Sequence, residues 1–122
     1  MIVFITFKWG LYMRLILLTA LIALSGCAAT ELRPDAQRVR ILTSPPNSDC
    51  KQLGDVTGGQ GNFFTGYYTS NSNLQTGAIN DLKNKAAAMG GNALLILSNT
   101  PGLYSGTQTT LTATGAVFAC KN

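Results

Sequence analysis

The sequence lacks histidine altogether, and charged residues make up only 11% of its 122 positions. General acid–base catalysis most often uses histidine, or a carboxylate held in a cleft beside a partner. Five acidic residues are present, and none stands at the spacing of a catalytic or metal-binding motif. The chain also has no Ser–Lys arrangement and no Cys-x-x-Cys pair. We therefore expect a protein that is not an enzyme and that carries no metal ion or other cofactor.

The N-terminal region combines an apolar run with a short motif that ends in cysteine. Residues 15–23 are apolar, and Leu24-Ser25-Gly26-Cys27 follows them directly. An apolar stretch closed by small residues is typical of a secretory signal peptide. The motif resembles the lipobox of bacterial lipoproteins. That resemblance implies attachment of a diacylglyceryl group to the Cys27 sulfur, then cleavage before Cys27 and acylation of its new amino group.

The lipobox predicts three parts of the chain: a lipoprotein signal peptide at 1–26, a tether at 27–36 and a small domain at 37–122. Translation could also start at Met13, because residues 13–26 alone form a complete lipoprotein signal. The alternative is an uncleaved transmembrane helix, which needs about 20 apolar residues. Lys8 and Arg14 interrupt that window.

The residue after the lipidated cysteine predicts the membrane to which the lipoprotein is sorted. In Gram-negative lipoproteins, an aspartate at that position retains the protein in the inner membrane, whereas Ala28 stands here. By resemblance to that rule, we expect an outer-membrane protein on the periplasmic face. Its lipid chains would hold it there, since each buried CH₂ group contributes about 0.8 kcal/mol.

Removal of the signal peptide changes the charge and the cysteine count. Taking 26 residues from 122 leaves 96, with seven basic and five acidic side chains, so the net charge falls from +4 to +2. No dense basic patch remains, and nucleic acid is not expected as a partner. Cys50 and Cys120 remain beside Cys27. An even pair in an exported protein predicts a disulfide.

Hydrophobic periodicity predicts an α+β fold in the order strand-strand-helix-strand-strand. We expect strands at residues 37–42, 50–58, 92–98 and 109–120 and a helix at 74–89. The helix is predicted from apolar residues spaced four apart, Leu74, Ala78, Leu82 and Ala86. We expect this single helix to pack on a mainly antiparallel sheet that one disulfide crosslinks.

Several finer features accompany the strands. Alternation in the first strand places Val39 and Ile41 inward, with Arg38 and Arg40 forming either a solvated face or an anionic-ligand patch. Gly54 predicts one β-bulge, and a change of alternation at 114–115 predicts another. Residues 103–108 read as a Gly/Ser loop between the last two strands.

A loop rich in glycine, serine and asparagine spans residues 59–73 and contains no charge. It carries four aromatic residues: Phe63, Phe64, Tyr67 and Tyr68. Loops of this length without regular structure are often functional. The rings form either a contact surface for a protein, a glycan or a membrane interface, or a cap over one end of the core.

Two motifs resemble a known family. They are C-x-x-L-G-x-V-x-G at residues 50–58 and A-A-x-M-G-G-N-A at 86–93, with a cysteine following at position 120. Together with the lipobox they resemble a family of small Gram-negative outer-membrane lipoproteins of unknown function. The layout is also similar to the lipoprotein that senses stress for the Rcs phosphorelay, although that sensor has two disulfides and a long tether.

The resemblance implies the same strand-strand-helix-strand-strand fold and no assigned activity. We expect a non-enzymatic envelope interaction protein, such as a sensor or an accessory subunit, bound to the membrane through its N-terminal lipid. Its partner would be an envelope protein or a glycan. The alternative is a glycan- or lipid-binding module that uses the aromatic loop at 63–68.

Overall fold

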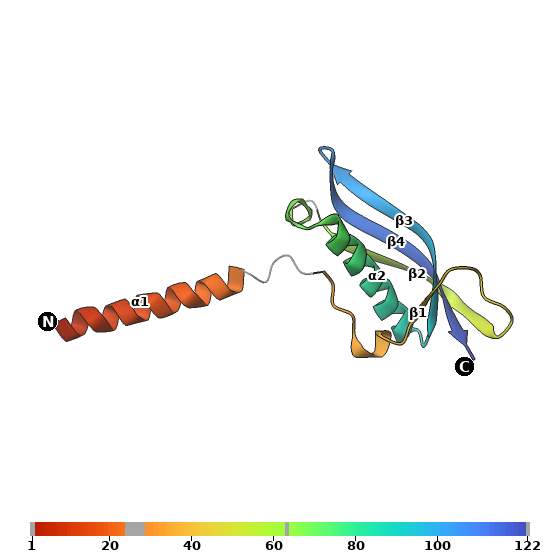
Figure 1. Ribbon diagram of the computed structural model, residues 1–122, viewed down its shortest axis with the longest axis horizontal. Helices are drawn as coiled ribbons and strands as arrows, with labels where there is room; N and C mark the ends of the chain where they lie inside the picture. The colour runs from red at the N-terminus through yellow and green to blue at the C-terminus, as the bar shows by residue number, and fades with distance from the viewer. Residues whose placement is uncertain (1, 24–28, 63, 122) are drawn as a thin grey trace.

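The computed structural model describes residues 2–23, 29–62 and 64–121. The elements are α1 (Ile2–Ala23), η1 (Pro34–Ala36), β1 (Arg40–Leu42), β2 (Cys50–Gly61), η2 (Gly66–Tyr68), α2 (Asn71–Ala88), β3 (Ala93–Tyr104) and β4 (Thr107–Cys120). The strands form one sheet in the order β1-β3-β4-β2. Helix α2 lies across one face of this sheet, and α1 stands apart from it (Figure 1). The predicted α+β fold with one helix packed on the sheet is confirmed.

Helix α2 forms where periodicity and capping agree. Ser70 is its N-cap and accepts a hydrogen bond from the Asn73 backbone N–H at 3.2 Å, which satisfies one of the free donors of the first turn. The helix ends at Ala88, and Gly90 follows with a φ of +83°, the left-handed conformation common after helix ends. The prediction for residues 74–89 is confirmed, although the helix begins three residues earlier.

The main core lies between α2 and the sheet. The buried side chains of one helix stripe face those of the inner sheet surface: Val39, Leu74, Ala78, Leu82, Ala86, Leu94, Leu111, Ala113 and Val117. The helix crosses β2 closely at Gly58, where a Cβ atom would lie 2.8 Å from the Ala78 carbonyl oxygen. Glycine at this position therefore lets helix and strand approach each other.

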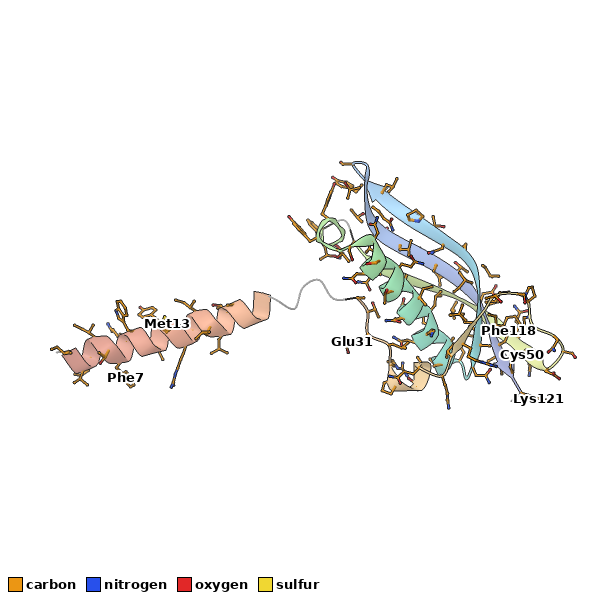
Figure 2. The ribbon with its side chains drawn as sticks, in the orientation of Figure 1. Phe7, Met13, Glu31, Cys50, Phe118 and Lys121 are labelled. Carbon is orange, nitrogen blue, oxygen red and sulfur yellow. A yellow bond between two sulfur atoms is a disulfide. The ribbon has the colours of Figure 1, made fainter. Side chains whose placement is uncertain are left out.

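A smaller cluster lies on the opposite face of the sheet, at the end where the chain terminates. Ala93, Ala116 and Phe118 are buried there, and the disulfide between Cys50 and Cys120 packs against them. Figure 2 shows Phe118 and Cys50 close together at this end. The two cysteines face each other across β2 and β4 and are 70 residues apart in sequence, so the predicted disulfide is confirmed.

The edges of the sheet differ from the sequence expectation. Strand β1 has three residues rather than six and pairs in parallel with β3, so the sheet is mixed. Val39 is buried as expected, whereas Ile41 is 40% exposed, because it lies on a short edge strand beyond the end of α2.

The long β3–β4 hairpin replaces the loop expected at residues 103–108. The strands continue to Tyr104 and from Thr107, and a two-residue turn joins them. Ser105 and Gly106 both have positive φ, as the type I′ hairpin turn requires. The bulge expected at Gly54 is confirmed. At the expected position 114–115 the register does shift, but the extra residue is Leu97 on the facing strand β3, and a further shift lies between Gly102 and Leu103.

Candidate functional site

One end of the sheet, at the β3–β4 hairpin, carries exposed aromatic side chains. We call it the aromatic end and define it by Phe64, Tyr67, Tyr68, Leu103 and Tyr104. The Tyr67 hydroxyl donates a hydrogen bond to the Tyr104 carbonyl oxygen at 3.1 Å, and the two rings meet edge to face with centroids 6.0 Å apart. Figure 1 shows η2 and the hairpin at the same end of the domain. The loop and the hairpin therefore form one surface.

The backbone of the loop holds these rings outward. The side-chain oxygen of Asn62 accepts hydrogen bonds from the N–H groups of Phe64 and Thr65, each at 2.9 Å. The N–H of Gly66 donates to the Asn62 carbonyl oxygen at 2.8 Å, and a Cβ at Gly66 would overlap the Thr109 carbonyl oxygen. The loop thus sits directly on β4, and its side chains point away from the core.

Three of the four aromatic residues predicted as an interaction surface lie at the aromatic end. Phe64 is 71% exposed, Tyr68 is 81% exposed and Tyr67 is partly exposed, whereas Phe63 lies outside the described residues. The described rings therefore do not cap the core. Two apolar residues, Leu74 and Leu111, are buried near that end instead.

The segments that form the aromatic end contain no charged residue. The sequence has no Asp, Glu, Lys or Arg at residues 59–80 or 86–120, which include the aromatic end and all of β3 and β4. Charged residues of the domain occur in residues 31–40, which include η1 and the start of β1, in residues 49–55, in the second half of α2 and at the C-terminus. The aromatic end therefore offers an uncharged surface.

The segment that follows the lipobox is bound to the domain. The side-chain oxygen of Gln60 accepts from the backbone N–H of Thr30 at 3.0 Å and also from the Thr30 hydroxyl. Asn80 donates to the Thr30 carbonyl oxygen at 2.8 Å. We call residues 29–33 the anchoring segment.

A second asparagine of α2 continues this binding. Asn84 donates to the Glu31 carbonyl oxygen and accepts from the Arg33 N–H, both at 2.9 Å. The described part of the expected tether is therefore docked along the helix through Thr30, Glu31 and Arg33. The one signal in the sequence was the spacing of Asn80 and Asn84, which places two amides on one face of the helix.

Two charged residues of α2 cover the free edge of the sheet. The Asp81 carboxylate accepts from the Gly59 N–H at 3.0 Å and from Lys85 Nζ at 2.9 Å. Lys85 also donates to the Thr57 carbonyl oxygen at 2.7 Å. Because β2 is an edge strand, these bonds occupy backbone groups that another strand could otherwise pair with. Asp81 and Lys85 thus have a structural role.

A surface cavity of about 280 Å³ lies at the opposite end of the domain, lined by Arg38, Arg40, Gly90, Gly91 and Asn92. Both arginines are exposed. This exposure fits either of the alternatives expected from the sequence, a solvated face or an anionic-ligand patch. Among the described residues, no group of three or more His, Cys, Asp or Glu side chains could hold a metal ion.

The remaining candidate residues lie in the N-terminal region. Cys27, the predicted lipidation site, lies outside the described residues. Helix α1 precedes it and is long and apolar enough over Ile2–Ala20 to cross a membrane, with none of that window buried. Such a helix is compatible with a signal peptide or with a membrane anchor.

Fold and site define a small, disulfide-crosslinked α+β domain behind an N-terminal apolar helix. The chain belongs to the DUF4156 family, a domain of unknown function that matches residues 30–120. This match begins at Thr30, whose backbone N–H donates to Gln60 and whose carbonyl oxygen accepts from Asn80.

The chain is similar to the uncharacterized protein YjeI of Escherichia coli strain K12, with 37% identity over 106 residues. That alignment covers 84% of this chain and 91% of the relative. The YjeI protein of Shigella flexneri is similar to the same extent.

Proposed function

We propose that the protein is an outer-membrane lipoprotein whose domain binds a partner at the membrane surface without catalysing a reaction. The Cys27 sulfur receives a diacylglyceryl group, residues 1–26 are then removed and the new amino group is acylated, and Ala28 directs sorting to the outer membrane. The exposure of α1 supports its removal, because the described side chains at residues 2–20 contribute nothing to either apolar cluster.

The observation that carries an interaction role is the docked anchoring segment. Thr30 is the third residue after Cys27, and the domain already holds it through Gln60 and Asn80. An extended chain spans at most about 3.5 Å per residue, so the lipidated cysteine lies within about 10 Å of the folded domain. The domain therefore works at the membrane surface as a sensor or accessory subunit of an envelope assembly. Signalling across the periplasm in the manner of the Rcs sensor would need a longer tether.

The positions of the carboxylates support a non-enzymatic role. Asp81 forms an ion pair with Lys85 that covers the sheet edge, and Asp35 forms one with Arg33 at 2.7 Å beside η1. Asp55 lies 3.5 Å from the Gln52 amide on the exposed side of β2. None of these three lines the cavity beside Arg38 and Arg40 or the one beside Ser72 and Thr76.

Metabolic labelling with palmitate, followed by mass measurement of the purified protein, tests the anchor. We expect label and an acylated N-terminus at residue 27, both lost in Cys27→Ala. A cross-linking census in intact cells then tests the interaction role, with Cys27→Ala as the unanchored control. The role is wrong if the wild-type protein and the control yield the same neighbours.

A second candidate function is glycan or lipid binding through the aromatic loop at 63–68. It is favoured by the exposure of Phe64 and Tyr68 on a surface without charge. For a glycan, purified peptidoglycan would sediment the wild-type protein, and Tyr68→Ala would reduce the bound fraction. Phe118→Ala is unsuitable as a control because Phe118 is buried, whereas Leu97→Ala changes an exposed residue away from the loop.

A further inference from the structure

We propose that the aromatic end rests in the headgroup region of the same bilayer that holds Cys27. This inference depends on the proposed membrane anchoring and names the bilayer as the occupant of the aromatic surface. Two independent features lead to it. One is the position at which the chain leaves the domain, and the other is the chemistry of the surface nearest to that position.

The exit point of the chain lies beside the aromatic end. Thr30 is held by Gln60, which is the penultimate residue of β2, and Phe64 follows only four residues later. Leu74 in the first turns of α2 lies against Gly61, so the start of the helix belongs to the same end. The lipid anchor therefore pulls this end of the domain toward the bilayer, and not the end that carries the disulfide.

The side chains at this end suit the membrane–water interface. Tyrosine is enriched there because its ring enters the apolar boundary while its hydroxyl stays hydrated. Tyr68 supplies such a ring, whereas the Tyr67 hydroxyl donates to the Tyr104 carbonyl oxygen, and Phe64 and Leu103 add apolar groups that are 71% and 68% exposed.

The absence of charge removes the main obstacle to contact with the bilayer. A charged side chain would have to be dehydrated as the surface enters the headgroup layer, at a large free-energy cost. Residues 59–80 and 86–120 contain none. The loop backbone is also prepared for contact, because Asn62 already accepts from the N–H groups of Phe64 and Thr65.

Contact at the aromatic end determines the direction of the opposite end. The cavity lined by Arg38 and Arg40 lies near the C-terminal end of α2, whereas the aromatic end adjoins the start of this helix. The arginines therefore point away from the bilayer into the periplasm. That end, with its charged side chains, is the surface left for a protein partner.

Fluorescence quenching by brominated lipids tests this orientation. The single tryptophan of the chain is Trp9, in α1, so Trp9→Phe gives a background without tryptophan. Tyr68→Trp then reports from the aromatic end, and Ser48→Trp, at an exposed position near Cys50, is the matched control. Each full-length variant is expressed, purified from membranes and reconstituted in phosphatidylethanolamine–phosphatidylglycerol vesicles with brominated acyl chains.

We expect the Tyr68→Trp emission to shift to the blue and to fall about twofold or more, as for rings buried 5–10 Å at the acyl boundary. The Ser48→Trp emission should match that in vesicles without bromine. Equal quenching of the two reporters would overturn the proposed orientation. So would an unquenched Tyr68→Trp reporter combined with loss of peptidoglycan sedimentation in Tyr68→Ala, which would assign the surface to glycan.

Mass measurement of the same samples separates this proposal from the lipoprotein proposal. An intact N-terminus without acyl groups would contradict lipidation of Cys27. The domain would then be attached through α1, which ends at Ala23, and the contrast between the two reporters would still decide the orientation. Tyr68 and Ser48 are both exposed, and non-reducing electrophoresis confirms that each variant retains the Cys50–Cys120 disulfide.

Discussion

The two ends of the sheet differ in what holds them together and in what they expose. At the end where β2 begins and β4 ends, the Cys50–Cys120 disulfide crosslinks the two strands, and Phe118 is buried against it. At the aromatic end, backbone hydrogen bonds and a close contact at Gly66 hold the loop, and the rings stay outside. Stabilising groups are thus concentrated at one end, while the other end keeps apolar surface available for binding.

The disulfide should give the largest effect at the crosslinked end. Replacing Cys50 and Cys120 with alanine removes a crosslink between residues 70 apart in sequence. The free energy of unfolding should fall by about 4 kcal/mol, because the unfolded chain gains conformational freedom. Denaturant unfolding followed by circular dichroism measures the loss. Reductant should lower the midpoint of the wild type and leave that of the double variant unchanged.

Two leucines allow a direct comparison between the core and the aromatic end. Leu82 is fully buried between α2 and the sheet, whereas Leu103 is 68% exposed near the hairpin turn. Leu82→Ala should lower the free energy of unfolding by about 3 kcal/mol, since it leaves a cavity. Leu103→Ala should change it by less than about 0.5 kcal/mol. Similar losses in both variants would show that Leu103 belongs to the folded core.

Two glycines test how the aromatic loop is held. A Cβ at Gly66 would overlap the Thr109 carbonyl oxygen, whereas at Gly59 it would meet the Leu111 carbonyl oxygen at an ordinary 3.5 Å. Gly66→Ala should cost about 2 kcal/mol, because backbone must shift, and Gly59→Ala should cost less. Hydrogen exchange should show increased exposure of residues 64–69 in Gly66→Ala alone. Unchanged exchange there would contradict the close seating of the loop on β4.

The smallest expected effect concerns the anchoring segment. Asn84→Ala removes the hydrogen bonds to Glu31 and Arg33 and should lower stability by about 1 kcal/mol. Limited proteolysis with a glutamate-specific protease should then cut after Glu31 faster than in the wild type, because the Glu31–Leu32 bond lies inside the anchoring segment. Asn99→Ala, at an exposed position on β3, serves as the control and should leave the cleavage rate unchanged. Equal rates in both variants would mean that Asn84 does not hold the segment.

The predictions from sequence were most accurate where the information is local. The spacing of Leu74, Ala78, Leu82 and Ala86 sets the buried stripe of α2, and capping by Ser70 only extends the helix. The pairing of Cys50 with Cys120 followed from their being the two cysteines of the domain. The hairpin was missed because Ser105 and Gly106 resemble ordinary loop residues, and their positive φ becomes visible only in the folded backbone.

By itself, the sequence determined the α+β element order, the disulfide and the absence of charge at residues 59–80 and 86–120, because each depends on residue type and short-range spacing. Only the tertiary structure decided which surface the aromatic residues form and where the anchoring segment lies. Tyr67 meets Tyr104 across 37 residues, and Asn80 binds Thr30 across 50. Contacts of this kind leave no local pattern, since they arise when packing of α2 on the sheet brings distant backbone and side-chain groups together.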